Sequence, residues 1–260
     1  MQANVKTVAE LEILREGGAR LAAIVERLCR DVRPGMTTQD IDNQARVLIA
    51  QVGGESAFLG YRPAGVKRPF PASVCVSVND EVVHGIPSAD KVLQEGDIVT
   101  IDCGLKYKGL FTDHAVTIAI GKTSEARQKL IDICRDSLYI GIDACQAGKT
   151  SLDAGRDIEQ FIAGRYGIVR ELSGHGVGYA VHEDPYVPNF AMKGKGTVLK
   201  PGMVIAVEPM LAIGSAAVWF LDDEYTVVTQ SGNMAAHWEH TIIITDGDPE
   251  IITLPGKFVL

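Results

Sequence analysis

The feature that most constrains the fold of this chain is an internal repeat that ends each time on an acidic residue. Residues 92–102 read VLQEGDIVTID and residues 198–208 read VLKPGMVIAVE, so Asp102 and Glu208 occupy matching positions. The apolar, β-branched residues before each acid are typical of buried strands. A buried carboxylate without a partner is costly, because burial disfavours its charged form. The two strands are therefore expected to bring their acids to a common site.

A second match supplies two further acids. Residues 113–116 read DHAV and residues 239–242 read EHTI, which aligns Asp113 with Glu239. Both acids border strongly apolar segments. Four acids at matched positions indicate a multivalent cation held between two related halves, because a cation compensates buried negative charge.

Each half also begins with two amphipathic helices, recognised by apolar residues at helical spacing and by Thr, Gly and Pro at their ends. The helix boundaries repeat as well, since GMTTQD at 35–40 matches GKTSLD at 148–153. The predicted helices span residues 8–31, 37–52, 125–146 and 150–166. We therefore expect an internally duplicated α+β fold with pseudo-twofold symmetry, forming one domain over residues 1–260 with halves at about 8–122 and 123–255.

Composition narrows the class of protein. The net charge is −8 and basic clusters are absent, which argues against nucleic-acid binding. The five cysteines form no CxxC pair, and their odd number argues against a complete disulfide framework. We expect reduced, mostly buried cysteines in a cytoplasmic protein. The charged N-terminal residues predict that the chain has no signal peptide.

One segment approaches the length of a membrane span. Residues 202–221 contain a single charge, but Glu208-Pro209 interrupts the middle of the segment and Gly214 follows. These breakers favour buried strands around a turn over a membrane helix. No membrane association is expected.

Asp102 and Asp113 flank a predicted hairpin turn. If the chain turns at Tyr107-Lys108, the two acids face each other directly, with Cβ atoms about 4.5–5.5 Å apart. The alternative is a pair of solvated acids on an exposed face. The apolar residues around both acids disfavour that alternative.

Four acids of this kind can bridge two divalent ions about 3.5–4 Å apart, the arrangement used in two-metal hydrolysis. His175 lies in SGHGVG, where glycines on both sides allow other groups to approach the ring closely. A lone histidine is more often structural, but four acids that need a cation favour a ligand. Oxygen ligands with one imidazole suit Mn, Fe, Co or Zn.

Two other histidines lie at turns beside glycine or proline. His84 is followed by Gly-Ile-Pro and His182 by Glu-Asp-Pro, so either residue could be an exposed loop residue. Near a metal pair, they are suited to bind a substrate amide or a developing oxyanion. His114, His237 and His240 are weaker candidates. His240 follows Glu239 along a strand, so its side chain is expected on the opposite face.

In combination these motifs resemble the type I methionine aminopeptidases, metallopeptidases of the pita-bread fold. The resemblance runs over nearly the whole chain, and it rests on CVSVNDEVVHGIP, GDIVTIDCG, TDHAVT, SGHGVG, VHEDP, KPGMVIAVEPM and HWEHTIIIT in family order. It implies a mainly antiparallel curved sheet with helices on its outer face. It also implies two divalent metal ions bound by five ligands, which are Asp102, Asp113, His175, Glu208 and Glu239.

The resemblance implies a mechanism and a substrate. His84, His182 and Glu208 would be catalytic, with both histidines contacting substrate and Glu208 transferring a proton from water to the leaving amine. The substrate would be the N-terminal methionine of nascent polypeptides near the ribosome, followed by a small second residue. We expect the protein to act as a monomer.

A methionine pocket should be apolar. Local alignment assigns it Phe58, Tyr61, Phe70, Cys75, Val181 and Tyr225, each of which could instead be a core residue. The chain departs here from better-known bacterial members of the family. Phe58 replaces a cysteine of those proteins, Val181 replaces a phenylalanine, and RPAGVKRPF at 62–70 adds residues before Cys75. These departures affect the shape of the pocket rather than the metal chemistry.

Two alternatives remain on the same scaffold. A proline-specific (Xaa-Pro) peptidase has a similar ligand set, but such relatives usually carry a large additional N-terminal domain. A non-catalytic binding module would have lost its ligands, whereas all five are present here.

Overall fold

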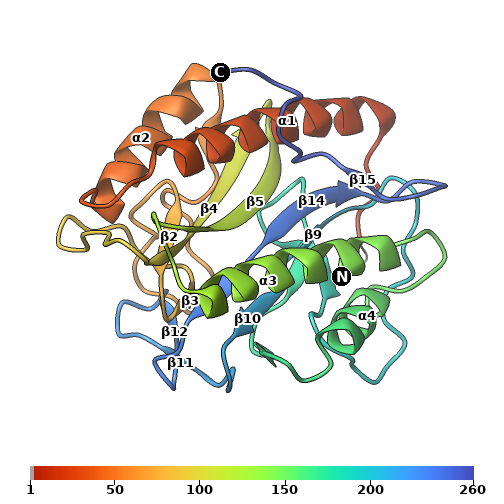
Figure 1. Ribbon diagram of the computed structural model, residues 1–260. Coiled ribbons are helices and arrows are strands. Elements are labelled where there is room, and N and C mark those ends of the chain that lie inside the picture. Colours follow the sequence, from red (N-terminus) through yellow and green to blue (C-terminus); the bar gives the residue numbers. More distant parts are fainter. Residues whose placement is uncertain (1–2) are drawn as a thin grey trace.

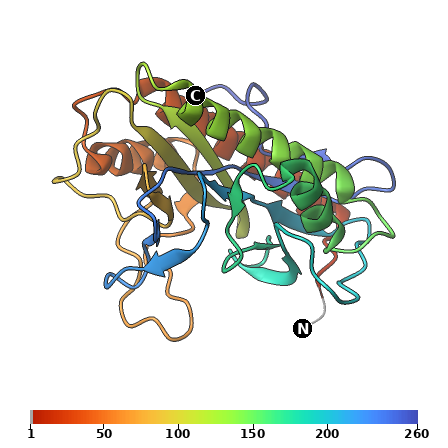
Figure 2. The ribbon, with the colours of Figure 1, turned by 60° about the horizontal axis from the view of Figure 1, so that its bottom comes forward.

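The computed structural model describes residues 3–260, where helices cover one face of a curved sheet (Figure 1). Figure 2 shows these helices together on one side of the sheet. The helices are α1 (Val8–Asp31), α2 (Thr38–Gln51), α3 (Glu125–Ala144) and α4 (Asp153–Ile162). The strands of the first half are β1 (Glu55–Ser56), β2 (Cys75–Val78), β3 (Glu81–Val83), β4 (Ile98–Tyr107) and β5 (Leu110–Ala119). Those of the second half are β6 (Gly167–Ile168), β7 (Gly174–Gly176), β8 (Glu183–Val187), β9 (Val204–Val207), β10 (Met210–Ala212), β11 (Val218–Phe220), β12 (Val227–Thr229), β13 (Ala235–His237), β14 (Glu239–Ile243) and β15 (Glu250–Ile251).

Both helices of the first half begin after a capping threonine, which was predicted from the sequence only for the second helix. Thr7 caps α1 and Thr37 caps α2, and in each case the acid three residues later bonds back to the backbone of the capping threonine. The predicted helix over 150–166 is shorter than expected. It ends at Ile162, because Ala163 and Gly164 adopt left-handed backbone conformations that cannot continue a helix.

The repeated segments before α2 and α4 share a pair of hydrogen bonds, although α2 begins directly after Thr37 and α4 begins only at Asp153. The Asp40 carboxylate accepts hydrogen bonds from the backbone N–H and hydroxyl of Thr37, at 2.8 Å each. Asp153 accepts the same pair from Thr150, at 2.7 and 2.9 Å. Each threonine also forms a β-bridge to the first residue of the acid-ending repeat, Thr37 to Val92 and Thr150 to Val198. The duplication predicted from the sequence is therefore present in the backbone.

The largest sheet joins strands of both halves. Its order is β1-β4-β5-β14-β9-β7-β8, with β2 also paired to β4 and β15 to β14. The strand pairs in this sheet are antiparallel, as predicted. β5 and β14 form the junction between the halves, where His114 opposes His240.

Alternation along the strands separates the core from the acids. In β4, Val99, Ile101 and Cys103 pack with apolar residues of α1 and α2. Asp102 lies between these positions in the sequence, so its side chain points to the other face of the sheet. In the second half, Ile242 and Ile244 pack with residues of α3 and α4. The helices therefore cover the apolar face and leave the acids on the inner, concave side.

The predicted register of the β4–β5 hairpin is wrong by two residues. Asp102 opposes Ala115 and Asp113 opposes Gly104, so the two acids are diagonal neighbours on one face rather than a directly opposed pair. The turn lies at Lys108-Gly109, and both residues have positive φ. A two-residue hairpin turn of this kind requires positive φ at both positions, which glycine adopts readily.

The apolar segment 202–221 forms β9, β10 and β11; the first two are buried, as the sequence analysis favoured, whereas Trp219 and Phe220 of β11 are exposed. No helix among residues 3–260 has the length and apolar character needed to cross a membrane. The cysteines in this range are free thiols, and all of them are buried except the half-buried Cys29.

Candidate functional site

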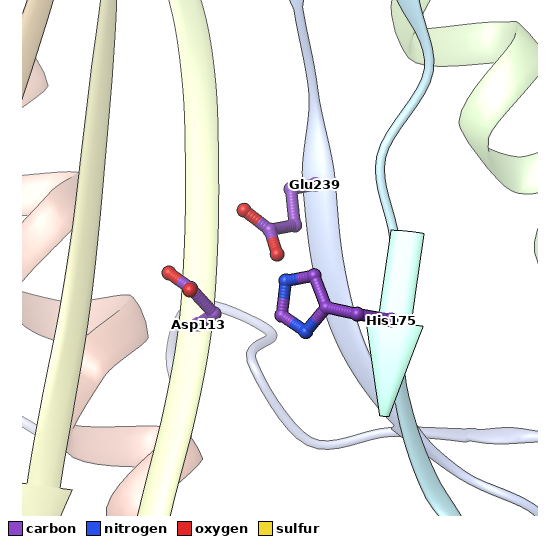
Figure 3. A group of neighbouring side chains, drawn as sticks. All are labelled: Asp113, His175 and Glu239. Carbon is purple, nitrogen blue, oxygen red and sulfur yellow. The ribbon is translucent and has the colours of Figure 1, made fainter. Parts of the chain in front are cut away.

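The five predicted metal ligands converge on the inner face of the sheet. Asp102 lies on β4, Asp113 on β5, His175 on β7 and Glu239 at the start of β14, while Glu208 directly follows β9. All five line one cavity. Figure 3 shows the side chains of Asp113, His175 and Glu239 as neighbours on three adjacent segments, and their ligand atoms lie within 4.8 Å of one another.

Close strand packing positions His175. It lies on β7 between β8 and β9, opposite Ala206. A Cβ atom on Gly174 would lie 2.4 Å from the carbonyl oxygen of Ala206, and one on Gly176 would lie 2.1 Å from that of Asp184. Both flanking residues must therefore be glycine, which supports the role that the sequence analysis gave them.

The four acids are buried together. Their exposed fractions are 7% for Asp102, 3% for Asp113, 8% for Glu208 and 2% for Glu239. Burial, followed by repulsion from neighbouring acids, raises the pKa of Asp102, Glu208 and Glu239 well above their usual range. Burial also raises the pKa of Asp113 to about 7. Within residues 3–260, no lysine or arginine contributes to any of these pKa values.

The donor set fits a divalent cation. Asp102 Oδ1 and Glu239 Oε1 are buried and have no hydrogen-bond partner among residues 3–260. Burial lowers the pKa of His175 to about 3, so its ring is neutral and can coordinate a cation. Clustered carboxylate oxygens and one neutral imidazole suit Mn, Fe, Co or Zn.

His84 and His182 lie on the same cavity. Burial lowers the pKa of His84 to about 4, and its ring bonds the backbone carbonyl of Tyr225. The backbone of His84 has φ 58, a left-handed conformation that is uncommon outside glycine and clusters at functional sites. His182 lies at the edge of the His175 ring, with ring centroids 4.4 Å apart. Its Nδ1 is 2.7 Å from the hydroxyl of Tyr61.

The cavity continues from the acids into an apolar chamber, with a total volume of about 490 Å³. Five of the six predicted pocket residues line it, which are Phe58, Tyr61, Phe70, Cys75 and Tyr225. Val181 does not line the cavity. It is buried in the same apolar cluster as the other five.

The sequence analysis missed several lining residues. Pro63 and Val66 come from the additional segment 62–70, whose composition marked it as an insertion but gave no direction for its side chains. Leu172, Met210 and Phe220 also line the cavity. The first two lie close in sequence to His175 and Glu208, which is the only signal that could have identified them.

The three weaker histidine candidates, His114, His237 and His240, have different surroundings. His114 and His240 stack on each other, and Tyr139 of α3 contacts the His240 ring. The expectation that His240 points away from the acids is therefore confirmed. His237 is different, because its ligand atom lies within 4.8 Å of those of Glu208 and Glu239.

A fold with acids from two matched halves around one cavity defines a metallopeptidase scaffold. A model of metallopeptidase family M24 matches residues 12–246, and the chain belongs to this family.

Similar proteins within this family narrow the assignment to methionine aminopeptidases. Methionine aminopeptidase of Clostridium acetobutylicum is 41% identical over 251 residues, which cover 96% of this chain and 98% of that protein. The crystal structure of methionine aminopeptidase from Thermotoga maritima superposes with a TM-score of 0.92 at 36% identity, covering 97% of this chain and 100% of that chain. These matches confirm the resemblance drawn from the sequence motifs, and with it the pita-bread fold.

The scaffold of the proline-specific alternative is similar over only part of its length. Xaa-Pro dipeptidase from Bacillus anthracis superposes with a TM-score of 0.76 at 26% identity, covering 98% of this chain but 63% of that chain. The proline-specific reading is therefore less well supported than the methionine-specific one.

Proposed function

We propose that this protein hydrolyses the first peptide bond of peptides and nascent polypeptides that begin with methionine, with preference for a small second residue. The observation that carries the proposal is one cavity with a buried acid cluster on one wall and an apolar chamber beside it. The acids serve the chemistry, and the chamber accepts an unbranched apolar side chain. The similarity to methionine aminopeptidases supports the same assignment.

The proposed ligands of two divalent ions are Asp102, Asp113, His175, Glu208 and Glu239. When bound, such ions lower the pKa of an attacking water and polarise the carbonyl of the first residue. Glu208 accepts a proton from this water and delivers it to the amine that leaves.

The two substrate-binding histidines take complementary roles that follow from their hydrogen bonds. The His84 ring donates its N–H to the carbonyl of Tyr225, so its other nitrogen is free to accept from a substrate amide. We assign the proton of the 2.7 Å contact between Tyr61 and His182 to the Tyr61 hydroxyl, which then donates to Nδ1 of His182. The neutral ring of His182 then carries its proton on Nε2 and can donate to the developing oxyanion.

The methionine side chain is proposed to occupy the chamber lined by Phe58, Tyr61, Phe70, Cys75 and Tyr225, with Val181 buried in the same apolar cluster. The thiol of Cys75 bonds the Asp102 carboxyl, so this residue lies where the chamber meets the acids. Such an apolar site discriminates by shape, and one missing methylene is worth about 1–3 kcal/mol. Branched or shorter side chains should therefore be released more slowly.

Three further properties are part of the proposal. The halves at about 8–122 and 123–255 form one catalytic domain, since the largest sheet runs through both and each supplies acids. The protein acts as a monomer in the cytoplasm, where its free cysteines remain reduced. It acts on chains that emerge from the ribosome.

The test uses purified protein with added Mn²⁺ or Co²⁺ and the peptide Met-Ala-Ser. We expect release of methionine, and a loss of at least about 100-fold in Asp102→Asn or Glu239→Gln, in line with the size of electrostatic contributions to catalysis. Asp90→Asn, which changes an exposed acid, is the matched control and should leave activity unchanged.

Other outcomes separate the alternatives. Cleavage of Xaa-Pro peptides alone would show that the specificity assignment is wrong. A protein that binds no metal would remove the enzymatic proposal and favour a binding module. Metal analysis of protein prepared without added metal identifies which ion the site selects, because affinity order and supply both decide occupancy.

A further inference from the structure

The carboxylate of Glu208 lies between two imidazole rings. Its Oε1 is 3.3 Å from Nε2 of His175, and its Oε2 is 3.4 Å from Nε2 of His237. His175 belongs to the proposed ligand set. His237 has no role in the mechanism given above, yet it faces Oε2 of Glu208, the carboxylate oxygen that is not next to His175.

The backbone holds His237 firmly beside Glu208. His237 pairs with Met210 in the β10–β13 ladder, two residues after Glu208. Thr117 Oγ1 donates to the backbone carbonyl of His237 at 2.7 Å and accepts from the backbone N–H of His237 at 2.9 Å. On the other side, Asn189 Nδ2 donates to the backbone carbonyl of Glu208 at 3.0 Å. These hydrogen bonds all involve the backbone of His237 or Glu208, and they fix the position of both residues without using either side chain.

The His237 ring is buried without a partner of its own. It is 2% exposed, and neither ring nitrogen has a hydrogen-bond partner among residues 3–260. A buried donor left unsatisfied costs about 1–3 kcal/mol, so an N–H of this ring should find an acceptor. Glu208 Oε2 faces Nε2, and an ionised carboxylate only accepts. The 3.4 Å separation is long for a hydrogen bond, but catalytic hydrogen bonds are often long before the site is loaded.

His237 lies behind the site rather than in it. All five proposed ligands line the cavity, whereas His237 does not. The ligand atoms of Glu208, His237 and Glu239 do lie within 4.8 Å of one another. Because His237 is outside the cavity, however, its position favours a role in supporting Glu208 over direct coordination of a cation.

We propose that His237 is a positioning residue, whose Nε2–H donates to Oε2 of Glu208 and holds the carboxylate so that Oε1 faces the reacting groups. The inference rests on the proposed role of Glu208 in proton transfer. Without this hydrogen bond, only the bound ions would orient the Glu208 carboxylate, and its acceptor oxygen would be held less closely in the productive direction. Proton transfer, rather than substrate binding, is the step that depends on this orientation.

The test compares two substitutions. His237→Gln keeps an N–H donor, and His237→Leu removes it while keeping an apolar side chain of moderate size. We expect His237→Leu to lower kcat about 10- to 100-fold, the range for loss of a hydrogen bond to a charged group, with KM for Met-Ala-Ser within about threefold. His237→Gln should recover kcat to within about threefold of the wild type. If circular dichroism shows that His237→Leu does not fold, His237→Met is used in its place.

Two readouts do not depend on turnover. Co²⁺ affinity, measured by calorimetry, should fall by about 10- to 100-fold in His237→Leu, which loses an outer hydrogen bond to a metal ligand, and stay within about threefold of the wild type in His237→Gln. The visible absorption of the Co²⁺-loaded protein should shift in His237→Leu and resemble the wild type in His237→Gln. These readouts report on His237 even if the wild-type protein releases no methionine, in which case only the proposed function fails.

Three results would overturn the inference. Wild-type kcat in His237→Leu would show that Glu208 needs no support. An equal loss of kcat in both variants would show that the donor is not what matters. An equal loss of Co²⁺ affinity in both variants, above about tenfold, would make His237 a metal ligand instead.

Discussion

His114 and His240 stack face to face where the two halves of the sheet meet. Their ring centroids lie 4.7 Å apart and their planes differ by 9°. The two residues oppose each other across β5 and β14, and they also occupy matching positions in the sequence repeat. The local twofold axis of the duplication therefore passes between two histidines, directly behind the acids Asp113 and Glu239.

This stack should make stability depend on pH. Burial lowers the pKa of His114 to about 4 from an unfolded value near 6.5, so its contribution is present above pH about 6.5 and is lost as the pH falls toward 4. In EDTA-treated protein, His114→Phe should lose less stability than the wild type between pH 8 and pH 5. Urea unfolding at both pH values measures the difference. Parallel losses in the two proteins would contradict the assignment.

The acid cluster should have the opposite dependence. Burial raises the pKa of Asp113 to about 7, so its contribution is present below pH about 4 and is lost as the pH rises through 7. Metal-free Asp113→Asn should therefore be more stable than the wild type at pH 8, by about 1–4 kcal/mol at 1.4 kcal/mol per pKa unit, and equal to it near pH 4. Urea unfolding in EDTA measures this. Added Mn²⁺ should then stabilise the wild type far more than Asp113→Asn, and equal stabilisation would argue against a ligand role.

The hydroxyl of Tyr61 should affect catalysis through His182. Tyr61→Phe removes the 2.7 Å hydrogen bond to Nδ1 while keeping the ring that lines the cavity. A hydrogen bond of this kind is worth about 0.5–1.5 kcal/mol, so kcat/KM for Met-Ala-Ser should fall about 2- to 12-fold. Tyr186→Phe, at an exposed position, is the matched control. Unchanged kinetics in Tyr61→Phe would mean that His182 keeps its tautomer without help.

A buried ion pair ties the N-terminal segment to the turn that carries His182. The Lys6 ammonium bonds Glu183, both side chains are almost fully buried, and Asn4 donates to the other oxygen of Glu183 at 2.7 Å. Lys6→Met should lower the free energy of unfolding by about 3–5 kcal/mol, because it leaves a buried carboxylate without its cation. Adding Glu183→Gln should recover part of this loss. A double variant no more stable than Lys6→Met would indicate that the lysine matters for packing alone.

Several parts of the fold and site could be predicted from the sequence because they depend on local chemistry. Thr37 and Asp40 form a capping box whatever the surrounding fold, and Asp153 accepts the same pair of hydrogen bonds from Thr150, although α4 begins only at Asp153. The acids that adjoin matched apolar runs had to share a site, since burying them separately is costly. The hairpin register was missed because the turn depends on which residues adopt positive φ, and Lys108-Gly109 satisfies this better than Tyr107-Lys108.

The sequence by itself therefore determined the duplication, the capped start of α2, the face of the sheet away from the acids for His240 and the identity of the clustered acids. These follow from periodicity and capping, which operate over a few residues. Only the tertiary structure placed Val66 and Phe220 in the cavity, paired Tyr61 with His182 and set His237 against Glu208. Those contacts join segments far apart in the chain, and packing of the whole molecule, rather than any local preference, decides which side chains meet.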